Sequence, residues 1–179
     1  MSETLALQSW LEPMGLQPRL PVLLALLLLG AGLDLRKRRI PNLLTVGGAV
    51  IGLAMGLWAV PPLGGAASLA GLALGLALML PFYATGVMGA GDVKLMAMAG
   101  SFLGAGPTLR AVFFVWITGG LLALAWALLR GAWGPLWANL RALGRSGQGH
   151  AHSVGKLPYG VSICLGTSAS VLTQRLGSF

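Results

Sequence analysis

The sequence predicts an all-α membrane protein, a polytopic bundle of about six transmembrane helices. Of its 179 residues, 56% are hydrophobic and only 9% are charged, against roughly 25% charged in ordinary soluble domains. A water-soluble chain of this composition would have too few polar residues to cover its surface, whereas lipid accepts apolar side chains on every face of a helix. The composition therefore excludes a soluble globular enzyme.

Apolar segments long enough to cross a membrane recur along the chain. A helix needs about 20 apolar residues to cross about 30 Å of hydrocarbon. The segments that meet or approach this length are 20–35, 43–60, 66–84, 93–104, 111–129 and 157–172. The fourth and sixth are short, so we expect them to face protein rather than lipid. Residues 1–18 contain Glu3 and Glu12 but no basic residue, and we expect a periplasmic interfacial segment there, followed by a six-helix domain at 19–179.

The basic residues indicate how the bundle is oriented. Assigned to alternate loops, nine lie on one side (Arg36, Lys37, Arg38, Arg39, Lys94, Arg130, Arg141, Arg145 and Lys156) and three on the other (Arg19, Arg110 and Arg175). Because cytoplasmic loops are enriched in basic residues, the loops at 34–42, 85–94 and 130–156 are predicted to be cytoplasmic and both termini periplasmic. The net charge of +8 then indicates contact with anionic membrane lipids and not nucleic-acid binding.

Glycine is frequent, at 28 residues, and falls partly in register. The rows are Gly48, Gly52 and Gly56, then Gly71 and Gly75, then Gly100 and Gly104. Small residues at this spacing let helix backbones approach closely. We favour packing between helices of one chain, and the alternative is the seam of a homo-oligomer.

The chain contains only four carboxylates, of which two lie near predicted membrane boundaries. Glu3 and Glu12 belong to the N-terminal segment, which leaves Asp34 at the end of the first apolar segment and Asp92 before the fourth. They are 58 positions apart, but the charge pattern places both on the cytoplasmic side at the same depth, where they could meet. Ionisable residues in membrane segments are costly and usually functional.

A pair of close carboxylates suits peptide-bond hydrolysis. Two carboxylates within about 3 Å share a proton. The ionised member can take a proton from water while the protonated member donates to the scissile carbonyl. The pair titrates as a unit, so base and acid are not assigned individually. Taken alone, each residue has a structural alternative: Asp92 as a helix N-cap, and Asp34 as a boundary charge paired with the adjacent basic run.

The combined pattern resembles the type IV prepilin leader peptidases, the GxGD intramembrane aspartyl endopeptidases of bacteria. It consists of GAGDVKL at 89–95, an upstream Asp34 at the end of a first helix, and RIPN at 39–42. The stretch LPYGV at 157–161 also resembles the C-terminal pattern of the family. The resemblance implies cleavage of prepilins at the cytoplasmic face of the inner membrane, after a short basic leader, with catalytic roles for Asp34 and Asp92.

The resemblance also bears on cofactors and on the form of the enzyme. Longer members of the family carry paired Cys-x-x-Cys zinc motifs and also methylate the new N-terminus. This sequence has a single cysteine, Cys164, which permits no multi-cysteine zinc cluster. We expect a short, peptidase-only form of the tight-adherence (Flp) pilus type, with no metal and no cofactor.

The residues around the aspartates are expected to support the site. Gly89 and Gly91 would let backbone approach an extended peptide, although they could simply form a flexible loop. Pro41 and Asn42 belong to the motif. Lys94 could position an acidic group of the substrate, but we favour contact with lipid phosphate or structural pairing.

The remaining candidates are weaker. His150 and His152 fall in a Gly/Ser-rich loop and are expected to be solvated, and Cys164 is expected to be a small buried thiol. A different function, a small proton- or ion-coupled transporter, would use Asp34 and Asp92 as a cation site. Such sites tend to lie near the membrane midplane rather than at its boundary.

Overall fold

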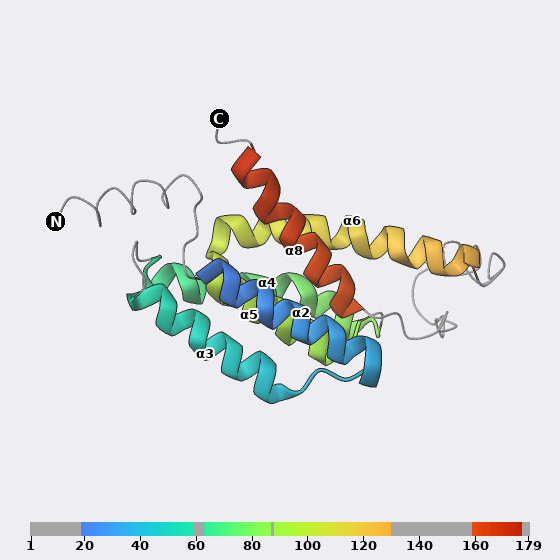
Figure 1. Cartoon of the computed structure of the whole chain (residues 1–179), viewed down its shortest axis with the longest axis horizontal. Helices are drawn as coiled ribbons and strands as arrows, with labels where there is room; N and C mark the ends of the chain where they lie inside the picture. The colour runs from blue at the N-terminus through green and yellow to red at the C-terminus, as the bar shows by residue number, and fades with distance from the viewer. Residues whose placement is uncertain (1–18, 59–62, 87, 130–158, 177–179) are drawn as a thin grey trace.

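The computed structural model describes residues 19–58, 63–86, 88–129 and 159–176, and within these ranges it contains six α-helices and no strand (Figure 1). The helices are α2 (Arg19–Lys37), α3 (Asn42–Trp58), α4 (Gly65–Ala84), α5 (Ala90–Leu103), α6 (Ala105–Leu129) and α8 (Tyr159–Leu176). The predicted all-α class is confirmed. The expected interfacial segment at 1–18 and the expected loop at 130–156 lie outside the described residues.

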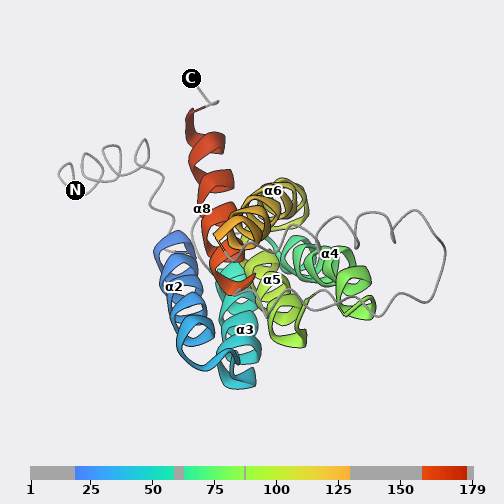
Figure 2. The same ribbon diagram turned by 90° about the vertical axis from the view of Figure 1, so that its right-hand side faces the viewer.

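The shortest helix, α5, is the centre of the bundle. It contacts each of the other five helices described, and Figure 2 shows it lying among them. From Leu95 to Leu103 every residue of α5 is buried. A helix surrounded by protein need not be as long as one that faces lipid, which explains its 14 residues. The expectation that the fourth apolar segment faces protein is confirmed.

Glycine allows the helices around α5 to approach it closely. A methyl group on Gly71 of α4 would collide with the carbonyl oxygen of Gly100 in α5, so the two backbones are in direct contact there. On the neighbouring side, a methyl group on Gly52 of α3 would collide with the hydroxyl of Ser101 in α5. The predicted glycine rows therefore serve packing within one chain, the interpretation favoured from the sequence.

The outside of the bundle is apolar, as a membrane requires. Two stretches, Gly65–Ala84 and Ala105–Ala125, are long and apolar enough to cross a membrane, yet only 22% and 28% of the 18-residue apolar window within each is buried. Large apolar side chains such as Leu43, Trp58 and Leu129 lie exposed. Several hydroxyl side chains, by contrast, are buried: Thr45, Ser68, Ser101, Thr108, Ser162, Thr167 and Ser170. A surface this apolar would be unstable in water and fits a helical membrane bundle.

The start of α6 differs from the prediction. The fifth segment was expected from residue 111, but α6 begins at Ala105. Gly104 ends α5 with a φ of +80°, a conformation that glycine adopts without steric cost. Its carbonyl then accepts the backbone N–H of Thr108 at 3.1 Å and the Thr108 hydroxyl, so the next helix starts at once. Pro107 falls in the first turn, where a helix tolerates proline.

One end of the bundle collects the helix ends that carry the predicted site. The C-terminus of α2 and the N-terminus of α8 lie together on the right of Figure 1. The N-terminus of α5 is at the same end, because Ile40, just after α2, packs against Gly91. Arg19 begins α2 at the opposite end.

Candidate functional site

Asp34 lies in the last turn of α2 and is buried, with 8% of its surface exposed. Its Oδ2 accepts a hydrogen bond from the backbone N–H of Gly160 at 2.9 Å. Arg38, just beyond the helix, interacts with this carboxylate electrostatically. Arg38 has a φ of 49°, a left-handed conformation that turns the chain out of α2 toward Ile40.

Asp92 is the third residue of α5 and is equally buried. Its Oδ2 accepts the backbone N–H of Gly89 at 3.2 Å. The alternative that Asp92 is the helix N-cap is wrong, because Gly89 occupies that position and Asp92 reaches back to it from the third helical residue. The other oxygen, Oδ1, is buried without a hydrogen-bond partner in the described part of the chain.

The two carboxylates lie near each other. Helices α2, α5 and α8 contact one another, and Asp92 is close enough to Asp34 to interact with it electrostatically. Tyr159, the first residue of α8, is within electrostatic range of Asp92. The first turn of α8 therefore lies beside both aspartates.

The other predicted site residues gather at the same end of the bundle. A methyl group on Gly91 would lie 3.2 Å from Cβ of Ile40, so the GxGD turn packs against the chain that follows α2. The Lys94 ammonium donates to Oδ1 of Asn42 at 2.9 Å. The Pro41 carbonyl accepts the N–H groups that begin α3. Lys94 thus has the structural pairing that the sequence favoured.

Basic side chains rim this end. Five are exposed there, namely Arg36, Lys37, Arg38, Arg39 and Lys94. Asp34 and Asp92 are the only carboxylate side chains within the described ranges, since Glu3 and Glu12 precede them. The site is a buried pair of acids behind a cationic rim.

Some predicted features fall elsewhere, and one residue was not predicted at all. Cys164 is buried in α8, and His150 and His152 lie outside the described residues. In the part of the chain that the structure describes, no three His, Cys, Asp or Glu side chains are grouped so as to hold a metal ion. Sequence reasoning missed the contact of Gly160 with Asp34, although the LPYGV stretch at 157–161 marked its place.

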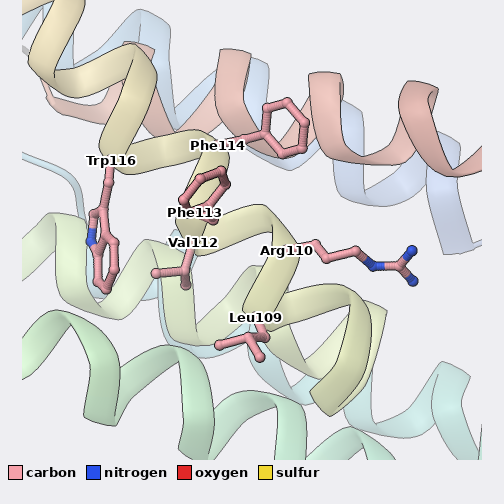
Figure 3. A pocket seen from close by; sticks show the side chains of 6 residues that line it. All are labelled: Leu109, Arg110, Val112, Phe113, Phe114 and Trp116. Carbon is pink, nitrogen blue, oxygen red and sulfur yellow. The ribbon is translucent and has the colours of Figure 1, made fainter.

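A hollow of about 280 Å³ lies along α6 (Figure 3). All of its lining residues come from that helix: Leu109, Arg110, Val112, Phe113, Phe114 and Trp116. Arg110 belongs to the N-terminal part of α6, whereas the carboxylates lie at the other end of the bundle. The hollow is therefore not part of the candidate site.

Comparison with known protein families identifies this chain. The sequence profile of the type IV leader peptidase family matches residues 21–124, more than half of the chain and a range that includes both aspartates. No curated protein and no solved structure matches the sequence. The matched range extends from the start of α2 through most of α6. With its all-helical bundle, the chain belongs to the type IV leader peptidase family.

Proposed function

We propose that this peptidase removes the short basic leader from type IV or Flp-type prepilins, with Asp34 and Asp92 together activating the attacking water. One observation carries the proposal: two buried carboxylates, from α2 and α5, lie at the same end of the bundle. Both lie within the range matched by the leader peptidase family. Burying two acids beside each other is costly, and such arrangements are typical of catalytic sites.

The chemistry is that of an aspartyl dyad. The ionised carboxylate takes a proton from a water held between the two acids, and the water oxygen attacks the carbonyl carbon of the scissile bond. The protonated carboxyl donates to the carbonyl oxygen. On collapse of the tetrahedral intermediate the C–N bond breaks, the leaving amine takes the proton that the first carboxylate had removed from water, and a hydroxyl of the intermediate returns a proton to the second carboxylate. Oδ1 of Asp92, buried and unpartnered among the described residues, is available to hold the water.

The position of the acids supports proteolysis over transport. Backbone unwound within lipid loses its hydrogen bonds, so a site at the end of the bundle requires less unfolding of a helical substrate. Transport sites tend to lie near the midplane, at broken helices, whereas Asp34 and Asp92 lie at helix ends. The transporter alternative has no comparable support.

We place the aspartates at the cytoplasmic face of the bacterial inner membrane, in a multi-pass chain with both termini periplasmic. The exposed basic rim supports this orientation, because cytoplasmic segments are enriched in Lys and Arg. The rim would also contact anionic lipid headgroups. Neither a metal nor a cofactor takes part in the proposed reaction.

Co-expression with a candidate Flp-type prepilin, followed by intact-mass analysis, tests the function. Wild type should remove a leader-sized fragment, whereas Asp34→Asn and Asp92→Asn should leave the prepilin intact at equal membrane levels. Glu3→Gln is the matched control and should cleave normally. An unchanged prepilin mass with the wild-type enzyme, for every prepilin tried, would contradict the proposal.

The mass of the product made by the purified enzyme in the presence of a methyl donor tests the peptidase-only form. One cysteine provides no Cys-x-x-Cys pair, so the product should have the mass of the cleaved peptide alone. A product about 14 Da heavier, the mass of one added CH₂, made by the purified enzyme with a methyl donor, would show a second activity.

A further inference from the structure

The first turn of α8 reaches the candidate site although it lies outside the range matched by the family. The backbone N–H of Gly160 donates to Oδ2 of Asp34 at 2.9 Å, and both residues are buried. Within the described ranges, the Asp34 side chain accepts this hydrogen bond and no other. Residues 126 positions apart are thus joined at the functional end of the bundle.

Position 160 has little room for any residue except glycine. A Cβ atom there would lie 3.0 Å from both Cβ and Oδ2 of Asp34, and 3.3 Å from Cγ. These distances are shorter than an ordinary carbon contact of about 3.5–4.0 Å. A side chain at position 160 would therefore displace the carboxylate by several tenths of an ångström.

The contact of α8 with α6 fixes the position of α8 along α6, and therefore the level in the bundle at which Gly160 contacts Asp34. The Thr118 hydroxyl of α6 donates to the Ser162 carbonyl of α8 at 3.1 Å. Further along, a methyl group on Gly166 would lie 2.6 Å from the backbone of Val115, so the two helices are in direct backbone contact. Close packing of this kind prevents sliding of one helix along the other.

We propose that Gly160 is a positioning residue of the peptidase, whose backbone N–H fixes the orientation of the Asp34 carboxylate. This inference rests on the proposed function. The hydrogen bond engages one oxygen of Asp34, Oδ2, and so restricts rotation of the carboxylate. Because reactions at enzyme sites depend steeply on placement, with a 1 Å error costing about 100-fold, a small displacement of Asp34 should lower turnover measurably.

Two substitutions at position 160 separate crowding from loss of the N–H donor. Gly160→Ala adds a methyl group but keeps the N–H, whereas Gly160→Pro removes the N–H and places the ring carbon Cδ where its hydrogen pointed at Asp34. Proline is tolerated in the first turn of a helix, where its missing N–H has no intrahelical partner. Gly32→Ala is the matched control, because it lies in the same helix as Asp34 with no atom within 4 Å of the added methyl group.

The assay is cleavage of a purified prepilin by the purified full-length enzyme across a pH range. We expect kcat to fall about 10-fold for Gly160→Ala and about 100-fold for Gly160→Pro, with KM within about two-fold of wild type and Gly32→Ala unchanged. A donated N–H favours the ionised carboxylate, so its loss should also move the pH profile of Gly160→Pro to higher pH. A merely structural role would not produce that shift, and thermal stability is measured alongside.

The outcomes separate the two proposals. Equal kcat and equal pH profiles for Gly160→Pro and Gly160→Ala would overturn the positioning role alone, provided that wild type cleaves and Asp34→Asn does not. If Gly160→Pro does not accumulate, Gly160→Ala decides, and a kcat within two-fold of the Gly32→Ala value would overturn the role. A wild-type enzyme that cleaves no prepilin would overturn the proposed function and this inference with it.

Discussion

Replacing Gly71 with alanine should destabilise the bundle, although alanine is the better helix former. The added methyl group would collide with the Gly100 carbonyl oxygen and lie 2.8 Å from Cα of Gly104. Carbon atoms pack at about 3.5–4.0 Å, so α4 and α5 must separate by roughly 1 Å. Overpacking costs about 1–3 kcal/mol, and the upper end applies because backbone cannot rotate away. Allowing roughly 0.5–1 kcal/mol for helix propensity, the net loss is about 2 kcal/mol.

Thermal unfolding in detergent, followed by intrinsic fluorescence, measures this effect. A loss of about 2 kcal/mol corresponds to a decrease in Tm of roughly 4–8 °C for a chain of this size. The control is Gly47→Ala in α3, where no atom lies within 4 Å of the added methyl group, so propensity alone should raise stability by about 0.5–1 kcal/mol. The two substitutions are the same chemically and should have opposite signs. If Gly71→Ala were as stable as Gly47→Ala, the close contact of α4 with α5 would be refuted.

The other predictions concern the rim of the site, its orientation and its pH dependence. Lys94→Met and Asn42→Ala should each lower the free energy of unfolding by less than about 1 kcal/mol, because the hydrogen bond between the two side chains is exposed. A double-mutant cycle should show a coupling energy of about 0.5 kcal/mol, and strictly additive losses would mean that the contact contributes nothing. A C-terminal alkaline phosphatase fusion should be active and a green fluorescent protein fusion dark, and the reverse pattern would place the aspartates on the periplasmic side. Cleavage should follow a bell-shaped pH profile, because both carboxyls are protonated at low pH and both ionised at high pH; a flat profile through both limbs would count against the dyad.

Much of the fold follows from the sequence because the helices are apolar and the segments between them are not. Each of the six apolar segments of the sequence corresponds to one of the six helices described. Hydropathy does not locate the boundary between α5 and α6, because no loop separates these two helices. Gly104 and Pro107 resemble a turn in the sequence, but a single left-handed glycine reverses the chain and α6 begins one residue later.

The candidate site, like the fold, could be predicted from the sequence only in part. The motif and the charge pattern predict that Asp34 and Asp92 meet, because ionisable residues are rare in an apolar chain and their sequence neighbours are distinctive. The third component, Gly160, could not be assigned its role from sequence. Its contribution is a backbone N–H, which every residue but proline possesses, and the packing of α8 against α6 and α2 brings that group to Asp34.

The central claim is that Asp34 and Asp92 act as one catalytic unit. Its most direct measurement is the cleavage rate of a purified prepilin by wild type, Asp34→Asn, Asp92→Asn and the double variant, at matched amounts of folded protein. Each single substitution preserves shape but prevents cycling between acid and base. Both should abolish cleavage, and the double variant should be little worse than either, as is usual for cooperating groups. A single Asn variant that accumulates normally and cleaves at the wild-type rate would contradict the account.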